Sequence, residues 1–354
     1  MVNRRQFLAG MGAALFSAAA AKSVRAAPED AVRSVDRAAA DILHAINARL
    51  QSLPEGETLF VPIGEYHPMP AHTLVIQGVL QKLRAQGTAF AFGYESAHDT
   101  YAGLLAADIV ADSRRKDEWF FRLASHDPHG HNMLRRILRE DLYYGSSNET
   151  NMNLFRHCLA DNISVSFNDL PSAYGAGRIY LDEQSLSVRW LAQWFGAGEQ
   201  ADVLSRNGMM MRNAAMVLGS MRHAVTEKSR IYIQQCGAYH LVGNEQYGMD
   251  YNKSLFSLYT QMGQAALPVD LAGHDKSYTA EMAAAMRANG LVIPDIDRTE
   301  FRYGSLSEKG RMRRKQDERN YMASLAAGSD IRLYEPAGPH LVWGQAGGSF
   351  SPAP

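Results

Sequence analysis

The fold of this chain is decided by residues 58–95, TLFVPIGEYHPMPAHTLVIQGVLQKLRAQGTAFAFGYE. Residues 58–64 are almost wholly apolar and predict a buried strand, although Pro62 donates no hydrogen bond to a neighbouring strand. Apolar residues then recur at helical spacing over residues 71–86, and residues 89–95 form a second apolar strand. Because a strand–helix–strand order joins parallel strands, this stretch predicts a parallel sheet.

The rest of the chain continues the alternation of helices and strands. A polar, charged segment at about 100–205 is predicted to be a helical insertion, and the Gly-, Pro- and Ser-rich residues 336–354 are predicted to be a loose tail. We therefore predict an α/β fold, with a central, mainly parallel sheet flanked by helices, in a single domain over residues 27–335. The further elements that we expect are helices over residues 31–51, 201–226 and 254–262, and strands over residues 163–167, 231–236 and 266–271.

The composition is that of a globular protein. The 354 residues are 46% hydrophobic and 21% charged, which excludes a disordered or collagen-like chain. With 36 Lys and Arg against 37 Asp and Glu, the formal charge of -1 argues against a nucleic-acid-binding protein, which needs a basic face. The two cysteines, Cys158 and Cys236, are too few for a disulfide scaffold or a Cys-rich zinc module. We expect the partner to be a small-molecule or peptide substrate.

The first 26 residues resemble an export signal. The pair Arg4-Arg5, followed by an uncharged run over residues 7–21, is similar to a twin-arginine motif. That run is shorter than the ~20 apolar residues of a membrane-spanning helix, and small residues precede a cleavage point before Ala27. We therefore predict a signal peptide over residues 1–26, a periplasmic or secreted location, and no stable membrane insertion after its removal. An uncleaved membrane anchor is the alternative.

Chemically versatile side chains follow three of the predicted strands. Glu65 and His67 follow the first strand, Glu95 ends the second, and His240 follows a later one. Because ligands bind at the carboxyl ends of parallel strands, we expect these side chains to meet at one edge of the sheet. A carboxylate beside an imidazole supports general acid–base catalysis, and both groups are also ligands for a divalent metal ion. Either carboxylate taken alone is more often a solvated or helix-capping group.

Other candidate residues lie near these four or on the long helix. Arg212 has a guanidinium that suits a developing oxyanion or a substrate carboxylate, although a structural ion pair is the simpler interpretation. Tyr66 and His72 flank His67, and together the three are candidate haem ligands, because imidazole and tyrosinate both bind haem iron. Three further histidines, interpreted as a solvated turn rather than as a metal site, are His126, His129 and His131.

Short motifs over residues 58–271 resemble those of the TIKI/TraB, erythromycin-esterase and ChaN-like superfamily. Members carry a Gly-Glu/Thr-x-His type motif after the first strand, a Glu ending the next strand, an Arg-Asp/Asn pair on a helix and a later Gly-x-x-His. The spacing of His67 and His72 is closest to the ChaN-like branch, which implies haem binding; the esterase branch implies a histidine-activated water, and the TIKI branch metal-dependent peptide cleavage. The matching positions are Gly64, Glu65, His67, Glu95, Arg212, Asn213, Gly237 and His240.

The first functional hypothesis is an exported hydrolase that cleaves an ester or an amide. His67 would be the base that activates a water molecule, and Glu65 or Glu95 would orient it. Arg212 and His240 would stabilise the tetrahedral oxyanion. In a metal-dependent form, the two carboxylates and the two imidazoles would instead hold a divalent ion that lowers the pKa of bound water. The sequence does not decide between the two forms.

The second hypothesis is a periplasmic protein that binds haem or iron at the same edge of the sheet. His67, His72 or Tyr66 would then ligate the iron. Export in a folded state suits a cofactor carrier as well as an enzyme. The sequence favours the hydrolase and leaves the haem-binding protein as the alternative.

Overall fold

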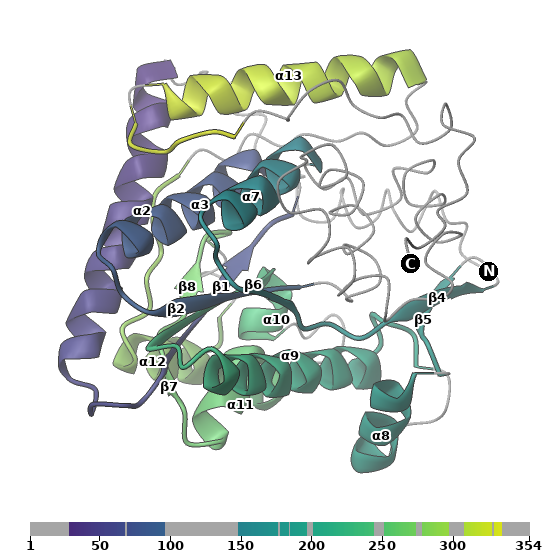
Figure 1. Ribbon diagram of the computed structural model, residues 1–354. Coiled ribbons are helices and arrows are strands. Elements are labelled where there is room, and N and C mark those ends of the chain that lie inside the picture. The colour runs from purple at the N-terminus through teal and green to yellow at the C-terminus, as the bar shows by residue number, and fades with distance from the viewer. Residues whose placement is uncertain are drawn as a thin grey trace, which may run out of the picture.

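A computed structural model gives the fold of this chain (Figure 1). The predicted signal peptide, the predicted tail over residues 336–354, the first part of the predicted insertion and the histidines around His129 lie outside the residues that it describes. The described residues are 28–67, 69–95, 148–175, 178–183, 185–196, 201–243, 251–273, 278–296, 308–327 and 329–334.

Six strands among the described residues form one parallel sheet, and this confirms the predicted α/β fold. The strand order is β3-β2-β6-β1-β7, and β8 also pairs with β1. Glu65 lies opposite Gly237, so the central strands β1 and β6 end level with each other. The bounds are β1 Leu59–Glu65, β2 Phe90–Tyr94, β3 Val165–Phe167, β6 Ile231–Gly237, β7 Ala265–Ala266 and β8 Val269–Asp270.

The last predicted strand, over residues 266–271, consists of two short strands in the structure. β7 pairs with the beginning of β1 and β8 with its end. The backbone oxygens of Phe60 and Gly64 bond to this side, so the alternate residue between them, Pro62, faces the same side without an N–H group. Pro268 lies at the break itself. The prediction of one continuous strand is wrong because both prolines remove donors from the ladder.

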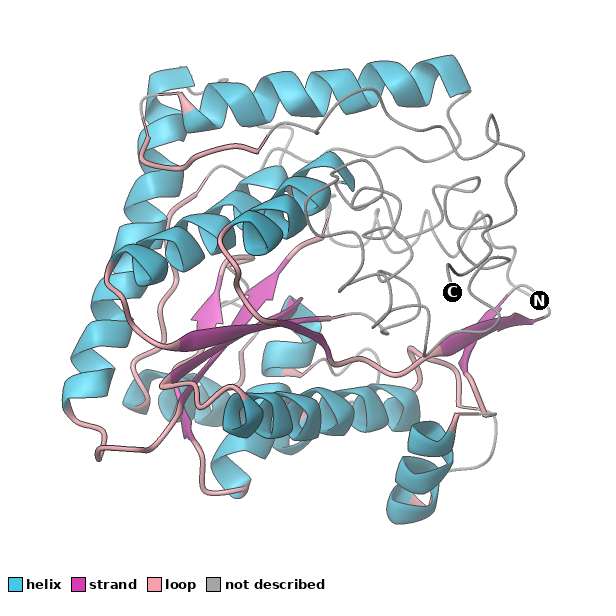
Figure 2. Cartoon of the chain, viewed as in Figure 1, coloured by secondary structure: helices cyan, strands magenta, loops and turns pink. Residues whose placement is uncertain are grey.

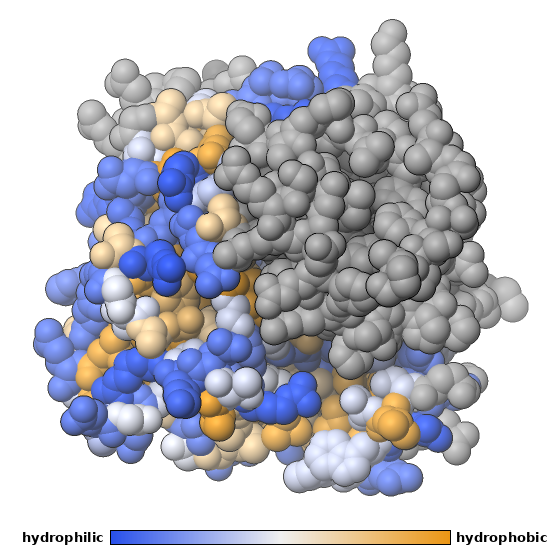
Figure 3. All heavy atoms as spheres, in the orientation of Figure 1, coloured by the Kyte–Doolittle hydropathy of each residue, from blue (hydrophilic) through white to orange (hydrophobic). Residues whose placement is uncertain are grey.

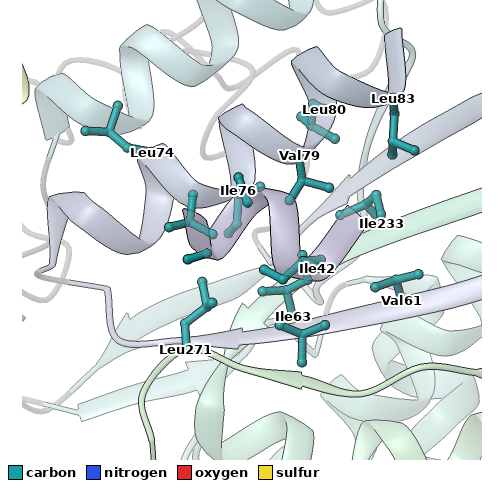
Figure 4. Packing of buried hydrophobic residues seen from close by; sticks show 14 of the residues in the cluster. Ile42, Val61, Ile63, Leu74, Ile76, Val79, Leu80, Leu83, Ile233 and Leu271 are labelled. Atoms are coloured by element: carbon teal, nitrogen blue, oxygen red, sulfur yellow. The ribbon is translucent and has the colours of Figure 1, made fainter. Parts of the chain in front are cut away.

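Helices cover both faces of the sheet (Figures 1 and 2). Along β1 the side chains alternate: Val61 and Ile63 belong to the core under α2 and α3, and Phe60 belongs to the core on the other face. Figure 4 shows Ile42 of α2 and Val79 of α3 packed around Ile63. On the first face lie α2 (Pro28–Gln51), α3 (Pro70–Ala85), α7 (Asn148–Ala160) and α13 (Glu308–Ala326), and on the second α9 (Arg206–Thr226), α10 (Ala238–Val242), α11 (Leu255–Gln261) and α12 (Ala280–Ala288).

The described residues of the predicted insertion, which lie between 148 and 205 with gaps at 176–177, 184 and 197–200, form strands as well as helices. α7 packs against α3 and α13, and β3 pairs with β2, so both belong to the main layers. A hairpin of β4 (Ser172–Gly175) and β5 (Arg178–Leu181) and the helix α8 (Leu186–Phe195) complete this segment. α9 begins at Arg206 rather than near 201, because the Ser205 hydroxyl accepts a hydrogen bond from the Gly208 N–H at 3.1 Å and caps the helix.

The surface of α8 carries large apolar side chains. The exposed residues of this helix include Leu186, Trp190 and Trp194. At the lower right of Figure 3, where α8 lies, hydrophobic and hydrophilic residues are mixed on the surface. Trp190 and Trp194 contact each other edge to face, with their ring centroids 4.9 Å apart. Among the helices that the structure describes, none is both long and apolar enough to cross a membrane.

Candidate active site at the carboxyl ends of the strands

The four strand-end residues singled out in the sequence lie together in one cluster. His67 Nδ1 is 2.5 Å from Glu65 Oε1, and His67 Nε2 is 3.9 Å from Glu95 Oε1. His240 approaches the same oxygen of Glu95, with its Nε2 at 3.1 Å. The other oxygen of Glu95 accepts a hydrogen bond from the Gly237 N–H at the end of β6. The level ends of the parallel strands therefore bring two carboxylates and two imidazoles to one edge of the sheet.

Local sequence features fix the turn that carries His67. A Cβ at Gly64 would lie 3.1 Å from Ala238 Cα and 2.8 Å from Leu241 Cδ2, so glycine favours the close approach of α10 to β1. Beyond β1, the backbone N–H of Tyr66 donates to His72 Nδ1 at 2.9 Å. This bond ties the turn to the first turn of α3 and leaves His67 at its outer side.

His67 is the member of the cluster that is most open to solvent. Glu65 is 3% exposed, whereas the His67 side chain is 33% exposed. Burial alone would lower the pKa of His67, but the charge and hydrogen bond of Glu65, with the charge of Glu95, raise it to about 9. His67 is therefore protonated at neutral pH. A base needs a neutral imidazole, so this environment favours His67 as a proton donor rather than in its predicted role as base.

Glu95 is the anchor of the cluster. Its Oε1 accepts hydrogen bonds from Arg212 Nη2 at 2.8 Å and faces His240 Nε2, and its Oε2 accepts from the Gly237 N–H. Burial alone would raise the pKa of this carboxyl, but His240 and the other cationic groups around it hold the pKa well below its ordinary value. Glu95 is therefore ionised at neutral pH and holds the cations in place.

Arg212 is directed at Glu95 and Asp169. Its Nε lies 3.0 Å from Asp169 Oδ1, and its Nη2 lies 2.7 Å from Asp169 Oδ2 and 2.8 Å from Glu95 Oε1. The guanidinium is 12% exposed. This geometry does not support the predicted role of Arg212 on an oxyanion; it indicates a group that positions Glu95.

His240 is also an internal group. Its Nδ1 lies 2.5 Å from Asn213 Oδ1, and the Nδ2 of the same amide donates to the Lys253 carbonyl at 2.7 Å. This orientation of Asn213 makes His240 Nδ1 a donor, and His240 Nε2 faces Glu95 Oε1. His240 is buried and both of its ring nitrogens have partners inside the protein, so it positions Glu95 rather than contacting an oxyanion as predicted.

His72 and Tyr66, two of the predicted haem ligands, differ in how exposed they are to solvent. His72 is fully buried in α3, and its Nδ1 accepts the Tyr66 N–H. Tyr66 itself is half-buried. Because the imidazole of His72 is turned into the protein to hold the turn, its position does not support a role as a haem ligand. His72 lies in the stretch Pro70–Leu80 of α3, in which every residue is buried.

The four clustered residues do not fit a divalent metal ion. A metal needs ligand atoms whose lone pairs point to a common free position. Here both oxygens of Glu95 are engaged by donors, and His67 Nδ1 faces Glu65. In the part of the chain that the structure describes, no group of three or more His, Cys, Asp and Glu residues is arranged to hold a metal. These residues form a network of ion pairs and hydrogen bonds instead.

The sequence analysis missed two residues of this network. Asp169 is the second residue after β3, so the same strand-end position that selected Glu95 indicates it. Gln235 is a buried amide in β6 that contacts both carboxylate residues, and a polar side chain inside a buried strand is the signal that indicates it.

Comparisons of this chain with protein-family models, with curated proteins and with solved structures find no match. The resemblance to the TIKI/TraB, erythromycin-esterase and ChaN-like superfamily therefore stays a prediction. The geometry and electrostatics of the clustered residues are what indicate a function for this chain.

Proposed function

We propose that this chain is a hydrolase that cleaves an ester or an amide with Glu65 and His67 as its proton-transfer pair. The observation that carries the proposal is the 2.5 Å contact between a buried carboxylate and a partly exposed imidazole at the carboxyl end of β1. In parallel sheets this edge is where substrates bind. The twin-arginine-like N-terminus supports the further proposal that the enzyme acts in the periplasm or outside the cell.

Glu65 has one oxygen available for proton transfer. Its Oε1 contacts His67 and Gln235, whereas Oε2 has no hydrogen-bond partner among the described residues. In the proposed reaction, Oε2 accepts a proton from a water molecule as the water oxygen bonds to the substrate carbonyl carbon. Protonated His67 donates to the leaving oxygen or nitrogen as its bond to that carbon breaks.

After cleavage of an ester, two proton transfers return His67 and Glu65 to their starting states. The new carboxylic acid product loses its proton to His67, which restores the imidazolium, and Glu65 releases the water-derived proton to solvent. The sum is an ester and a water molecule converted to a carboxylate, an alcohol and a proton. Glu95, held by Arg212 and His240, keeps a negative charge 3.9 Å from His67 Nε2 and so favours its protonated form.

The pH dependence of hydrolysis tests this assignment. The reaction requires protonated His67, whose pKa is about 9, so the rate is expected to hold through neutral pH and to fall as the pH rises through about 9. The measurement is the rate on p-nitrophenyl esters and on aminoacyl p-nitroanilides across this pH range, with and without prior dialysis against EDTA. We expect dialysis to leave the rate unchanged.

Two results would contradict the proposal. If EDTA abolishes the rate and a divalent metal restores it, the reaction depends on a metal and the metal-free proposal is wrong. Absence of hydrolysis, together with a haem Soret band that His67→Gln removes, would favour the haem-binding alternative. The exposed His44 on α2 provides the matched control, because His44→Gln removes a histidine remote from the sheet edge.

A further inference from the structure

Gln235 lies between the two carboxylate residues of the candidate site. It is the fifth residue of β6 and is 2% exposed, so its amide needs partners inside the protein. The side-chain Oε1 accepts a hydrogen bond from the backbone N–H of Glu95 at 3.0 Å. On its other side the amide nitrogen, Nε2, donates to Glu65 Oε1. One side chain thus bridges the ends of β1 and β2 through β6.

The partners of Gln235 fix which way its amide points. The Glu95 N–H is a donor and requires the amide oxygen, while the Glu65 carboxylate is an acceptor and requires the amide nitrogen. The reversed amide would place donor against donor and acceptor against acceptor. The orientation is therefore set by the backbone of β2 and imposed on Glu65.

This orientation has a consequence for Glu65. Its Oε1 accepts from both Gln235 Nε2 and His67 Nδ1, so that oxygen is held in one place. The other oxygen, Oε2, is buried without a partner among the described residues. The carboxylate is thereby held in the one rotamer that faces His67 with Oε1 and keeps Oε2 for a water or substrate proton.

We infer that Gln235 is a positioning residue that locks Glu65 against His67 and directs proton transfer to Glu65 Oε2. The inference rests on the proposed function for its catalytic meaning. The locking itself is a property of the resting protein, and it is measured independently of any substrate.

The test is the titration of the His67 imidazole by NMR in Gln235→Met. Without the amide donor, Glu65 is free to leave its rotamer and the ion pair with His67 weakens. We expect the midpoint of His67 to fall by about one pH unit or more from its wild-type value. On a substrate that the wild type hydrolyses, we expect kcat to fall about 10–100-fold with little change in KM, because a misplaced catalytic group lowers the rate more than binding.

Two further variants serve as a control and as a substitute for Gln235→Met. Gln77→Met removes another fully buried amide, which bonds to Asn153 and to the Arg332 carbonyl away from the sheet edge, and it should leave the His67 midpoint unchanged. If Gln235→Met does not fold, Gln235→Asn retains an amide that is one methylene too short to bridge both partners, and it should lower the midpoint likewise.

An unchanged or raised His67 midpoint in folded Gln235→Met or Gln235→Asn would overturn the inference. Absence of hydrolysis by the wild type would overturn the proposed function instead. The two failures are distinguishable because the NMR titration needs no substrate.

Discussion

Replacing Glu65 with glutamine is expected to lower the rate of hydrolysis by about 10²–10⁴-fold. An amide cannot take the proton of the attacking water, and it removes the charge that keeps His67 protonated. The measurement is kcat/KM on the ester or amide that the wild type cleaves best. Because the two residues act as one unit, the double variant Glu65→Gln/His67→Gln should be about as active as the less active of the two single variants.

The control for this experiment is Glu149→Gln. Glu149 Oε2 pairs with Arg319 Nε at 2.8 Å between α7 and α13, away from the carboxyl ends of the strands. We expect this variant to retain the wild-type rate. A folded Glu65→Gln protein with an undiminished rate would show that the pair is not the proton-transfer group.

Replacing Glu95 with glutamine is expected to lower the free energy of unfolding by about 3–5 kcal/mol. The neutral amide removes the charge that Arg212 and His240, both nearly buried, share, while Arg212 keeps its ion pair with Asp169. The measurement is urea denaturation at neutral pH. Glu149→Gln again serves for comparison: its partner Arg319 is 37% exposed, so we expect it to cost at most about 1 kcal/mol.

The cost of Glu95→Gln should also depend on pH. Because the folded protein holds the pKa of Glu95 below its ordinary value of 4.5, its contribution is present above about pH 4.5 and is lost as the pH falls further. The difference in unfolding free energy between wild type and variant should therefore shrink in acid. A difference that is small at neutral pH, or that grows in acid, would contradict the role of Glu95 as the anchor.

The sequence was sufficient to predict the central fold for a specific reason. The stretch over residues 58–95 combines two long apolar strands with a helix between them, and each element is long enough for its periodicity to be read. The strand-end argument then placed Glu65, Glu95 and His240 at one edge. Asp169, which lies just after β3, could have been predicted at this edge in the same way. Pro268 in the sequence indicates the break between β7 and β8. The other proline, Pro62 of β1, faces β7 and β8 only once the sheet has formed, so the sequence alone does not show its effect.

The roles within the site depend on contacts that a sequence does not contain. Arg212 differs from a substrate-binding arginine in that Asp169 and Glu95 both lie beside it, and the three residues are far apart in the chain. Likewise, His67 becomes a donor rather than a base because carboxylates from two strands surround it. His72 lies within Pro70–Leu80, a stretch of α3 in which every residue is buried. The sequence predicts the start of this helix to within one residue, but it does not show that His72 Nδ1 meets the Tyr66 N–H.

The most direct test of the central claim is the NMR titration of the His67 ring nitrogens in the wild-type protein. His67→Gln identifies the signal by its loss. We predict that the imidazole stays protonated through neutral pH and titrates near pH 9, and that Glu65→Gln moves this midpoint downward. A wild-type midpoint at or below the ordinary value of 6.5, or one that Glu65→Gln leaves unmoved, would contradict an ion pair that holds the proton for catalysis.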